Sequence, residues 1–508
     1  MSDKSVVIAL RSQARLVIVE APAGCGKTYQ GAAYAREISE KISPGRLLIL
    51  AHTHAACDIF ASRTSGRERH VDIRTIDSLI NQIAAAYHIT LGLPQDIGAW
   101  VQSREDGYSE LASMVANLLS CSPMIAQALA KRYPIIICDE HQDASEDQHK
   151  IIMSCFQGGA SLRIFGDPMQ RIYGSRNKKR IEADIQRWED LKNEADTFEE
   201  LNYPHRWAEG SYPLGHWILN ARMALQSGGC LDLSGHLPSG VRVIFAENKS
   251  PRTYGGYSLE VDEAKRIYEN VNATSSLLVL SAHNGTVGAL RAFFNRRLPI
   301  WEGHVRENLE ALVIAEEKYR GDAKRIAQAV VMFLNKVTKG FTMSSFGNTL
   351  CNEVCCGCVA ERKGRKAILQ ELGRMIINQP DHKGVAKVLY RLSKLIKADP
   401  SFKNVIVDYS REFWEAVSIG KFDNPCEGFS EISRRRSYCR PLPPDKAIST
   451  IHKAKGLECN DVLIIPCDSE HFGNSINARC RLYVAMSRAR HSLTFVVSRK
   501  KPSSLIKL

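Results

Sequence analysis

A glycine-rich segment near the start of the chain carries the residue types that hold a polyphosphate. The apolar run Leu16–Glu20 has the length of a buried strand, and a helix-forming pattern follows the glycines. Glycine N–H groups can approach phosphate oxygens at a helix N-terminus, a lysine can reach the terminal phosphates, and a threonine hydroxyl can ligate Mg²⁺. We therefore predict binding of ATP and Mg²⁺; the alternative is a glycine-rich turn with a surface lysine. The segment reads Ala21-Pro22-Ala23-Gly24-Cys25-Gly26-Lys27-Thr28.

An acidic pair follows a second buried-strand pattern. Residues 133–138, which read Tyr-Pro-Ile-Ile-Ile-Cys, end directly before Asp139 and Glu140. A carboxylate at the carboxyl end of a parallel strand faces the crevice in which α/β sheets bind ligands. There Asp139 can hold Mg²⁺, and Glu140 can orient or deprotonate an attacking water. A solvated acidic loop end is the alternative, and the phosphate-binding pattern upstream argues against it.

Strands and helices alternate at both ends of the chain, which predicts the elements that must position these residues. Apolar runs of strand length occupy residues 162–165, 462–465 and 493–497, and residues 481–490 have an amphipathic helix pattern. The alternation predicts an α/β fold with two lobes built on parallel sheets. Helical patterns that interrupt lobe 2 end at the breaker Pro441-Leu442-Pro443-Pro444. The predicted organisation is lobe 1 at 1–186 with a small helical insertion at about 81–131, lobe 2 at 187–300 and 441–508, and a helical insertion in lobe 2 at 301–440.

The charge balance favours a polyanionic partner. Among 508 residues, 68 lysines and arginines outnumber 55 aspartates and glutamates, which gives a net charge of +13. Each phosphate that a basic surface neutralises releases counterions, which favours binding. The charge alone, however, is about equally compatible with a basic protein that has no polyanionic partner. No apolar stretch reaches the roughly 18 residues of a membrane-spanning helix. Fifteen cysteines without a secretion signal indicate reduced thiols, so we expect a cytoplasmic protein.

Four further segments complete an ordered set of motifs. Each lies at the end of a predicted strand or in a predicted helix. An arginine supplied from a second lobe can stabilise transition-state charge only when the lobes close, which couples hydrolysis to motion. The segments are residues 166–174 (Gly-Asp-Pro-Met-Gln-Arg-Ile-Tyr-Gly), 201–206 (Leu-Asn-Tyr-Pro-His-Arg), 450–458 (Thr-Ile-His-Lys-Ala-Lys-Gly-Leu-Glu) and 481–490 (Arg-Leu-Tyr-Val-Ala-Met-Ser-Arg-Ala-Arg).

In their order along the chain, these motifs resemble those of UvrD/Rep-type superfamily 1A DNA helicases, which have two RecA-like lobes. The resemblance implies that Lys27 and Glu140 act with a γ-phosphate-sensing glutamine, Gln170, and with two arginines, Arg206 and Arg488. It also implies further nucleotide contacts from His205, Gly456 and Glu458. For both arginines, an ordinary surface ion pair is the alternative.

The same resemblance implies a DNA-binding set and shows several departures from the family pattern. His52 stands where the family has a stacking phenylalanine, Asp77 where it has a histidine, and Ala21 where it has the first glycine. The family's adenine-reading glutamine has only Gln13 as its counterpart, fourteen residues before Lys27, which leaves base specificity open. The residues expected to contact single-stranded DNA are His52, Thr53, Arg63, Thr75, Tyr173, Thr450 and His452.

The resemblance implies an ATPase that translocates on single-stranded DNA, in the 3′ to 5′ direction, and unwinds duplex. The rival interpretation is a regulatory ATPase that senses DNA or nucleotide and gates a partner nuclease. The compact layout resembles the helicase-like subunit of the Gabija antiphage system, whose partner is an OLD-type nuclease. A DNA-binding module without hydrolysis is disfavoured because Lys27, Asp139, Glu140, Gln170 and Arg488 occur together. No nuclease signature stands out, so we expect no cutting by this chain.

Two features of the helical insertion have less specific patterns. Cys351, Cys355, Cys356 and Cys358 fall within eight residues, but adjacent cysteines fit metal-ligand spacing poorly, so we expect buried structural thiols. The run Arg434-Arg435-Arg436 fits a phosphate-backbone contact and a solvated basic stretch equally well.

Overall fold

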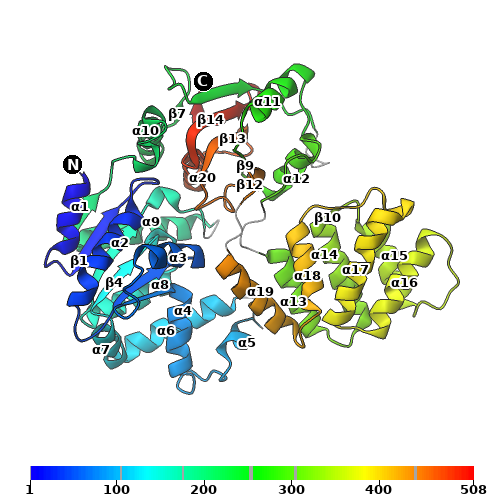
Figure 1. Ribbon diagram of the computed structural model, residues 1–508, viewed down its shortest axis with the longest axis horizontal. Helices are drawn as coiled ribbons and strands as arrows, with labels where there is room; N and C mark the ends of the chain where they lie inside the picture. Colours follow the sequence, from blue (N-terminus) through cyan, green and yellow to red (C-terminus); the bar gives the residue numbers. More distant parts are fainter. Residues whose placement is uncertain are drawn as a thin grey trace. The chain divides into compact units, whose positions relative to one another are not determined.

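The chain forms two compact units in a computed structural model (Figure 1). The first comprises Met1–Val101, Asp106–Trp301 and Pro443–Leu508, and the second comprises Gln102–Glu105 and Glu302–Leu442. The structure describes residues 2–102, 104, 106–173, 177–250, 256–301, 306–439 and 443–508. Pro441 and Leu442 of the predicted breaker lie outside the described residues.

The first unit contains a six-stranded parallel sheet, ordered β3-β2-β4-β5-β1-β6. Its central strands are apolar and buried because helices cover both faces. Alternate residues of β1 therefore enter different cores: Leu16 and Ile18 face one cluster, and Val17 and Val19 face the other. The strands are β1 (Leu16–Glu20), β2 (Leu47–Ala51), β3 (Val71–Thr75), β4 (Ile135–Cys138), β5 (Ser161–Gly166) and β6 (Thr197–Glu200).

Helices of the first sheet divide between these two cores. One core receives Val6, Tyr34 and Phe60 from α1, α2 and α3, and the other is filled mainly from α4 and α6 to α9. The strand β6 comes from residues that the sequence analysis assigns to lobe 2, yet it pairs with β1. The helices are α1 (Ser2–Arg11), α2 (Lys27–Ile38), α3 (His54–Arg63), α4 (Ile76–Ala86), α5 (Ile97–Gln102), α6 (Gly107–Cys121), α7 (Pro123–Arg132), α8 (Glu146–Gln157) and α9 (Lys178–Glu194).

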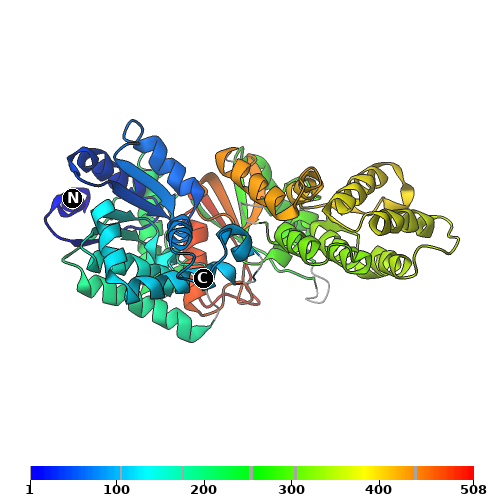
Figure 2. The same ribbon diagram turned by 90° about the horizontal axis from the view of Figure 1, so that it is seen from below.

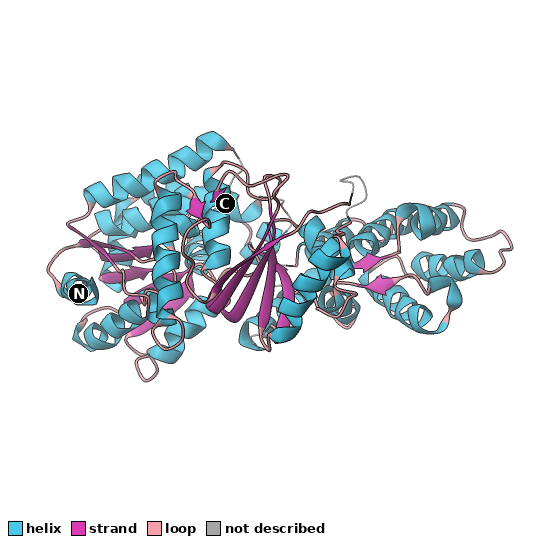
Figure 3. Cartoon of the chain, turned by 90° about the horizontal axis from the view of Figure 1, so that it is seen from above, coloured by secondary structure: helices cyan, strands magenta, loops and turns pink. Residues whose placement is uncertain are grey.

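A second parallel sheet, ordered β12-β9-β13-β14-β8, completes the first unit (Figure 3). Two sheets of parallel strands flanked by helices confirm the predicted α/β class. One core of this sheet continues to Ala23 in the phosphate loop and Met169 after β5. The elements are α10 (Tyr212–Gln226), β8 (Val241–Phe245), α11 (Val261–Ala273), β9 (Leu277–Ser281), α12 (Asn284–Phe293), β12 (Lys446–Thr450), β13 (Cys459–Cys467), α20 (Ile476–Met486) and β14 (Ala489–Val497), with a small pair β7 (Leu231–Asp232) and β15 (Ile506–Lys507).

One predicted helix boundary was wrong. The helical pattern of residues 481–490 suggests a helix through Arg490, but α20 ends at Met486 and β14 begins at Ala489. The strand must begin there because Ala489 pairs with Cys459 on β13. Arg488 therefore lies in the turn between helix and strand.

The second unit is a helical bundle, coloured from green to orange in Figure 2. Its core includes Leu309, Val330, Leu389 and Phe413. The amphipathic α14 and α17 each bury one apolar face in this core. The elements are α13 (Glu307–Lys318), α14 (Ala323–Val337), the π-helical η6 (Met343–Gly347), α15 (Asn348–Cys355), α16 (Arg365–Asn378), α17 (His382–Ala398), α18 (Ser410–Ile419) and α19 (Pro425–Cys439), with a short pair β10 (Thr338–Lys339) and β11 (Ile406–Val407).

The cysteine group of this unit differs from the expectation of buried thiols. Cys358 is buried, but Cys355 and Cys356 are exposed and Cys351 is half-buried. The buried face of α15 is formed by Leu350, Glu353 and Val354, so Cys355 lies on the exposed side of its last turn. Among the described residues, no group of three or more histidine, cysteine, aspartate or glutamate side chains is arranged to hold a metal ion. The side chains of Arg434, Arg435 and Arg436 lie outside the described part of α19.

No single described helix is long and apolar enough to cross a membrane. Helices α6 and α7 meet that test only as a pair, by length and composition, and the chain bends by 99° between them.

Candidate nucleotide site

The phosphate loop connects the buried end of β1 to the first turn of α2. Gly24 and Gly26 have φ angles of 76° and 88°, a left-handed conformation that glycine adopts without the strain of a side chain. Gly26 precedes Lys27 as the N-cap of α2, where helix N–H groups are free to bind an anion. Thr28 follows in the first turn and is half-buried. The local geometry is therefore that of an anion-binding loop.

Residues from the short helix η4 (His205–Trp207) pack directly on this loop. The backbone N–H of Arg206 donates to the Gly24 carbonyl at 3.0 Å. A Cβ at Gly24 would lie 2.8 Å from both Arg206 Cβ and Trp207 Cζ3, and one at Gly26 would lie 3.1 Å from His205 Cδ2. The glycines therefore permit close approach of this second segment as well as of a ligand.

Lys27 and Glu140 form an ion pair beneath the loop, with Nζ 2.6 Å from Oε1. Burial opposes the charge of Lys27, but Glu140 and Asp139 outweigh that effect and raise its pKa. For Glu140, burial by itself would raise the pKa, but the charges of Lys27 and Lys455 outweigh it and lower the pKa. Both members of the pair are therefore charged at neutral pH.

Asp139 is buried and keeps one oxygen without a partner. Its backbone N–H donates to Leu50 at 2.9 Å, while Oδ1 makes no hydrogen bond and is shielded from solvent. Burial raises the pKa of this carboxyl, which means that a nearby cation would stabilise its ionised form. Mg²⁺ prefers oxygen ligands and uses few from the protein when phosphates supply the rest. An aspartate of this kind, near the charge of Lys27, fits that ion.

A hydrogen-bonded chain of polar groups links Glu140 to the next strand end. Glu140 has a φ of 53°, a conformation that is uncommon outside glycine and concentrates at functional sites. Gln142 Nε2 donates to Glu140 Oε2 at 2.6 Å, and Gln142 Oε1 accepts from the N–H of Asp167 at 2.9 Å. Asp167 Oδ2 then accepts from Gln170 Nε2 at 2.9 Å. Gln170 is thus held by its own loop and tied to the acidic pair.

Arg206 and Arg488 lie on the second-sheet side of the same site. Arg206 Nη2 is 2.6 Å from Glu458 Oε1, and Nη1 donates to the Ser487 carbonyl at 2.5 Å. Arg488 is buried, and its Nη2 lies 3.4 Å from Gln170 Oε1. Burial, together with the charge of Arg206, lowers the pKa of Arg488 to about 10, so it stays charged at neutral pH. The two predicted arginines therefore neighbour the phosphate loop and Gln170 respectively.

Most of the residues predicted to bind DNA lie at the carboxyl ends of strands in the two sheets. His52 and Thr53 follow β2, Thr75 ends β3, and Thr450 ends β12. Tyr173 is 47% exposed, and its hydroxyl donates to the His452 carbonyl at 3.0 Å.

The hydroxyls of Thr53 and Thr75 are already used within the fold. Each caps a helix by accepting a backbone N–H, from Ala56 at 3.2 Å and from Ser78 at 3.1 Å. Arg63 makes a different contact, because its guanidinium lies 6.0 Å from the centre of the Tyr29 ring on α2.

Comparisons with known proteins agree with this arrangement. The UvrD/REP helicase N-terminal domain matches residues 98–195, which include β4 and β5. The UvrD-like helicase C-terminal domain matches residues 446–496, which include β12, β13 and all but the last residue of β14. These two segments are therefore similar to UvrD-like helicase domains. A stretch of 71 residues is 35% identical to the RecBCD enzyme subunit RecB of Mycolicibacterium smegmatis. That stretch is 14% of this chain and covers 7% of the RecB subunit's length.

In this UvrD-like setting, Gln13 is badly placed to read a base. It is exposed and lies before the beginning of β1, whereas the phosphate loop leaves the other end of that strand. The strand between them spans five residues, or about 17 Å.

The structure adds site residues that the sequence analysis missed. Tyr483 of α20 accepts a hydrogen bond from the N–H of Ala23 at 2.9 Å. Arg222 of α10 contacts Glu20 and Asp167, the residues that end β1 and follow β5. One signal was present in the sequence: Arg222 falls at helical spacing from Ile218 on the apolar face of α10, and an arginine there indicates a buried acidic partner.

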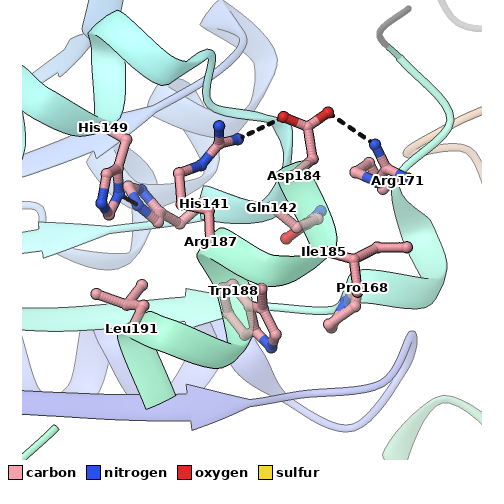
Figure 4. Close-up of a pocket in the computed structure, with 10 residues that line it drawn as sticks. All are labelled: His141, Gln142, His149, Pro168, Arg171, Asp184, Ile185, Arg187, Trp188 and Leu191. Carbon is pink, nitrogen blue, oxygen red and sulfur yellow. Dashed lines mark hydrogen bonds and ion pairs between the residues drawn. The ribbon is translucent and has the colours of Figure 1, made fainter. Parts of the chain in front are cut away.

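A small pocket lies behind Gln142, between the acidic loop and α9 (Figure 4). Its volume of about 20 Å³ is far too small for a nucleotide. His141 and His149 pair with each other at 3.0 Å, and burial lowers the pKa of both. Asp184 pairs with Arg171 at 2.8 Å and with Arg187 at 3.0 Å. We therefore assign this pocket to support of the acidic loop rather than to ligand binding.

Proposed function

We propose that this chain is an ATP-driven DNA translocase of the UvrD type. One observation carries the proposal: Lys27 with Glu140, Gln170, Arg206 and Arg488 come from the two sheets and converge around a single phosphate loop. Convergence of a lysine, an acidic pair, a glutamine and two arginines is what phosphoryl transfer to water requires.

The ion pair between Lys27 and Glu140 assigns each residue a task. Phosphate oxygens would compete for the Lys27 ammonium and release the carboxylate of Glu140, which can then accept a proton from the attacking water. Mg²⁺, held by Thr28 and Asp139, would neutralise charge on the β- and γ-phosphates. In the proposed site Gln170 contacts the γ-phosphate, and His205 with Gly456 and Glu458 completes the nucleotide contacts.

The arginines would connect hydrolysis to movement. Arg206 is paired with Glu458, so it must exchange this partner before it can stabilise a transferring phosphoryl group. Arg488 is already next to Gln170. Because the two sides of the site belong to different sheets, closure around ATP and reopening after hydrolysis would move DNA contacts on the two sides relative to each other. The proposed 3′ to 5′ direction rests on the family resemblance.

DNA-stimulated hydrolysis of ATP is the direct test. We expect hydrolysis with Mg²⁺ that rises on addition of single-stranded DNA and largely disappears in Lys27→Ala and Glu140→Gln. The matched surface variants Lys150→Ala and Glu146→Gln should leave the rate unchanged, because that ion pair is exposed on α8. Equal rates in all four variants and the unmodified chain would refute the proposal.

A second candidate is a regulatory ATPase that gates a partner nuclease of the OLD type, as in the Gabija system. The observation that favours it is the close packing of Arg206 and Trp207 on Gly24 of the phosphate loop, through which a bound nucleotide could be sensed. Strand-displacement assays on substrates with 3′ or 5′ overhangs separate the candidates. Displacement on 3′ overhangs supports the motor; ATP hydrolysis without displacement, together with co-purification of a nuclease, supports the gate.

A further inference from the structure

A buried arginine joins the helix layer of the second sheet to the two strand ends beside the phosphate loop. Arg222 lies on α10, whose residues Ile218 and Leu225 belong to the core of the second sheet. Its Nη2 is 2.6 Å from Glu20 Oε1 and 2.8 Å from Asp167 Oδ1, and its Nε donates to the same Asp167 oxygen at 3.1 Å. Arg222 is 6% exposed, Glu20 3% and Asp167 0%, so water screens none of these contacts.

The carboxylates come from adjacent strands, which explains why an arginine is needed. Glu20 pairs in register with Gly166, the residue directly before Asp167. Two buried carboxylates at neighbouring strand ends repel each other unless a cation lies between them. Buried ionic groups of this kind seldom stabilise a fold more than apolar residues of the same volume would. Stability alone therefore gives a weak reason for this arrangement.

Asp167 connects Arg222 to the candidate catalytic groups. Its Oδ1 accepts from Arg222, and its other oxygen, Oδ2, accepts from the Gln170 amide. That donation fixes the amide so that Gln170 Oε1 faces Arg488 Nη2 at 3.4 Å. The backbone N–H of Asp167 also holds Gln142, the partner of Glu140. The orientation of one carboxylate thus sets the orientation of the glutamine.

We infer that Arg222 is a positioning residue that acts through Asp167 on Gln170. The helix layer of the second sheet would thereby control the orientation of Gln170, the proposed γ-phosphate contact. This inference rests on the proposed function. A lysine at position 222 keeps the charge but has one ammonium in place of the guanidinium fork, so it cannot bridge both carboxylates in the same geometry.

A double-mutant cycle on ATP hydrolysis tests the inference. We expect Arg222→Lys to lower kcat about tenfold while the KM for ATP changes less than about twofold. If Arg222 acts through Gln170, adding Arg222→Lys to Gln170→Ala should cause no further loss. Multiplicative losses in the double variant would overturn the inference. If Arg222→Lys does not fold, the double variant Glu20→Gln with Arg222→Gln replaces it in the cycle. This double variant removes one charge of each sign.

Arg163→Lys is the matched control. Arg163 is also a buried arginine of the first unit, but it donates to the carbonyls of Leu10 in α1 and of Ala14 before β1. Gln170, by contrast, follows the carboxyl end of β5. Arg163→Lys should lower stability, and any loss of kcat that it causes should multiply with the loss caused by Gln170→Ala.

Amide hydrogen exchange on the nucleotide-free protein separates this inference from the function on which it rests. Arg222→Lys should speed exchange in residues 167–171, whereas Arg163→Lys should not. Absence of ATP hydrolysis in the unmodified chain refutes the proposed function, and unchanged exchange in these residues refutes the positioning role.

Discussion

The ammonium of Lys27 lies 2.6 Å from Oε1 of Glu140, so the candidate phosphate ligand and the candidate general base neutralise each other before any nucleotide binds. Glu140→Gln should therefore have two opposite effects. It removes the base, which should slow hydrolysis about 10² to 10⁴-fold, and it frees Lys27, which should tighten ATP binding. Single-turnover hydrolysis and binding of a fluorescent ATP analogue measure the two effects separately.

Lys27→Ala should behave differently because it removes the phosphate ligand itself. We expect weak binding of the analogue and no hydrolysis, with Asp139 and Glu140 left without the counter-charge of Lys27. If Glu140→Gln bound ATP more weakly than the unmodified chain, the assignment of the two roles would be wrong.

Gly24→Ala should weaken nucleotide binding through sterics rather than charge. A methyl group there would lie 2.8 Å from Arg206 Cβ and from Trp207 Cζ3, in a left-handed conformation with φ 76°. The helix η4 must then shift, and we expect at least about tenfold weaker ATP binding and a loss of about 1–3 kcal/mol in the free energy of unfolding.

Gly66→Ala is the matched control for this substitution. Gly66 has a φ of 84°, but no atom lies within 4 Å of the position of its added Cβ. It should cost about 1–2 kcal/mol through backbone strain and leave ATP binding unchanged. Equal effects of both substitutions on binding would show that the contact with η4 is irrelevant to the nucleotide.

The sequence predicts the parts of this site that depend on local patterns. Leu16–Glu20 is apolar throughout and the loop after it is rich in glycine, so a buried strand and an anion-binding turn follow from composition and spacing. The acidic pair follows another apolar run for the same reason.

Contacts between distant segments are where prediction from the sequence ends. Arg222 is 202 residues from Glu20 and 55 from Asp167, and no local pattern specifies which carboxylates it meets. The end of α20 depends on pairing of Ala489 with β13, which the amphipathic pattern of the helix does not contain. Register between strands and packing between helices decide such positions.

Lys455→Met should destabilise the first unit strongly. Lys455 forms an ion pair with Asp143, donates to the Gln170 carbonyl at 2.7 Å, and has a side chain that is only 9% exposed. Its loss leaves the Asp143 carboxylate buried without a counter-charge, which costs about 3–5 kcal/mol in the free energy of unfolding. Urea unfolding of the single variants and of Lys455→Met with Asp143→Leu measures the coupling.

We expect the double variant to recover most of the lost stability, because it removes both charges together. The control is Lys150→Met, whose partner Glu146 is 2.6 Å away on an exposed helix surface. That substitution should change the free energy of unfolding by less than about 0.5 kcal/mol. No recovery in the double variant would argue against the ion pair as the source of the effect.

Glu316→Gln should change how the stability of the second unit depends on pH. Glu316 of α13 is 3% exposed, and its Oε2 has no hydrogen-bond partner. Burial, with a smaller contribution from the charge of Asp381, raises the pKa of this carboxyl to about 8. The folded chain therefore keeps the proton while the unfolded chain releases it above its ordinary pKa of 4.5.

The sign follows from this difference. The stabilising contribution of the protonated carboxyl is complete below pH 4.5 and is lost as the pH rises towards 8, by roughly 1.4 kcal/mol per pH unit. Glutamine stays neutral, so at pH 8 the variant should be more stable than the unmodified chain, and at pH 4.5 it should have no advantage. Urea unfolding at several pH values provides the measurement. Glu317→Gln, at an exposed neighbouring position, should leave the pH dependence as it is. Parallel pH profiles for Glu316→Gln and the unmodified chain would show that the Glu316 carboxyl is ionised in the folded state.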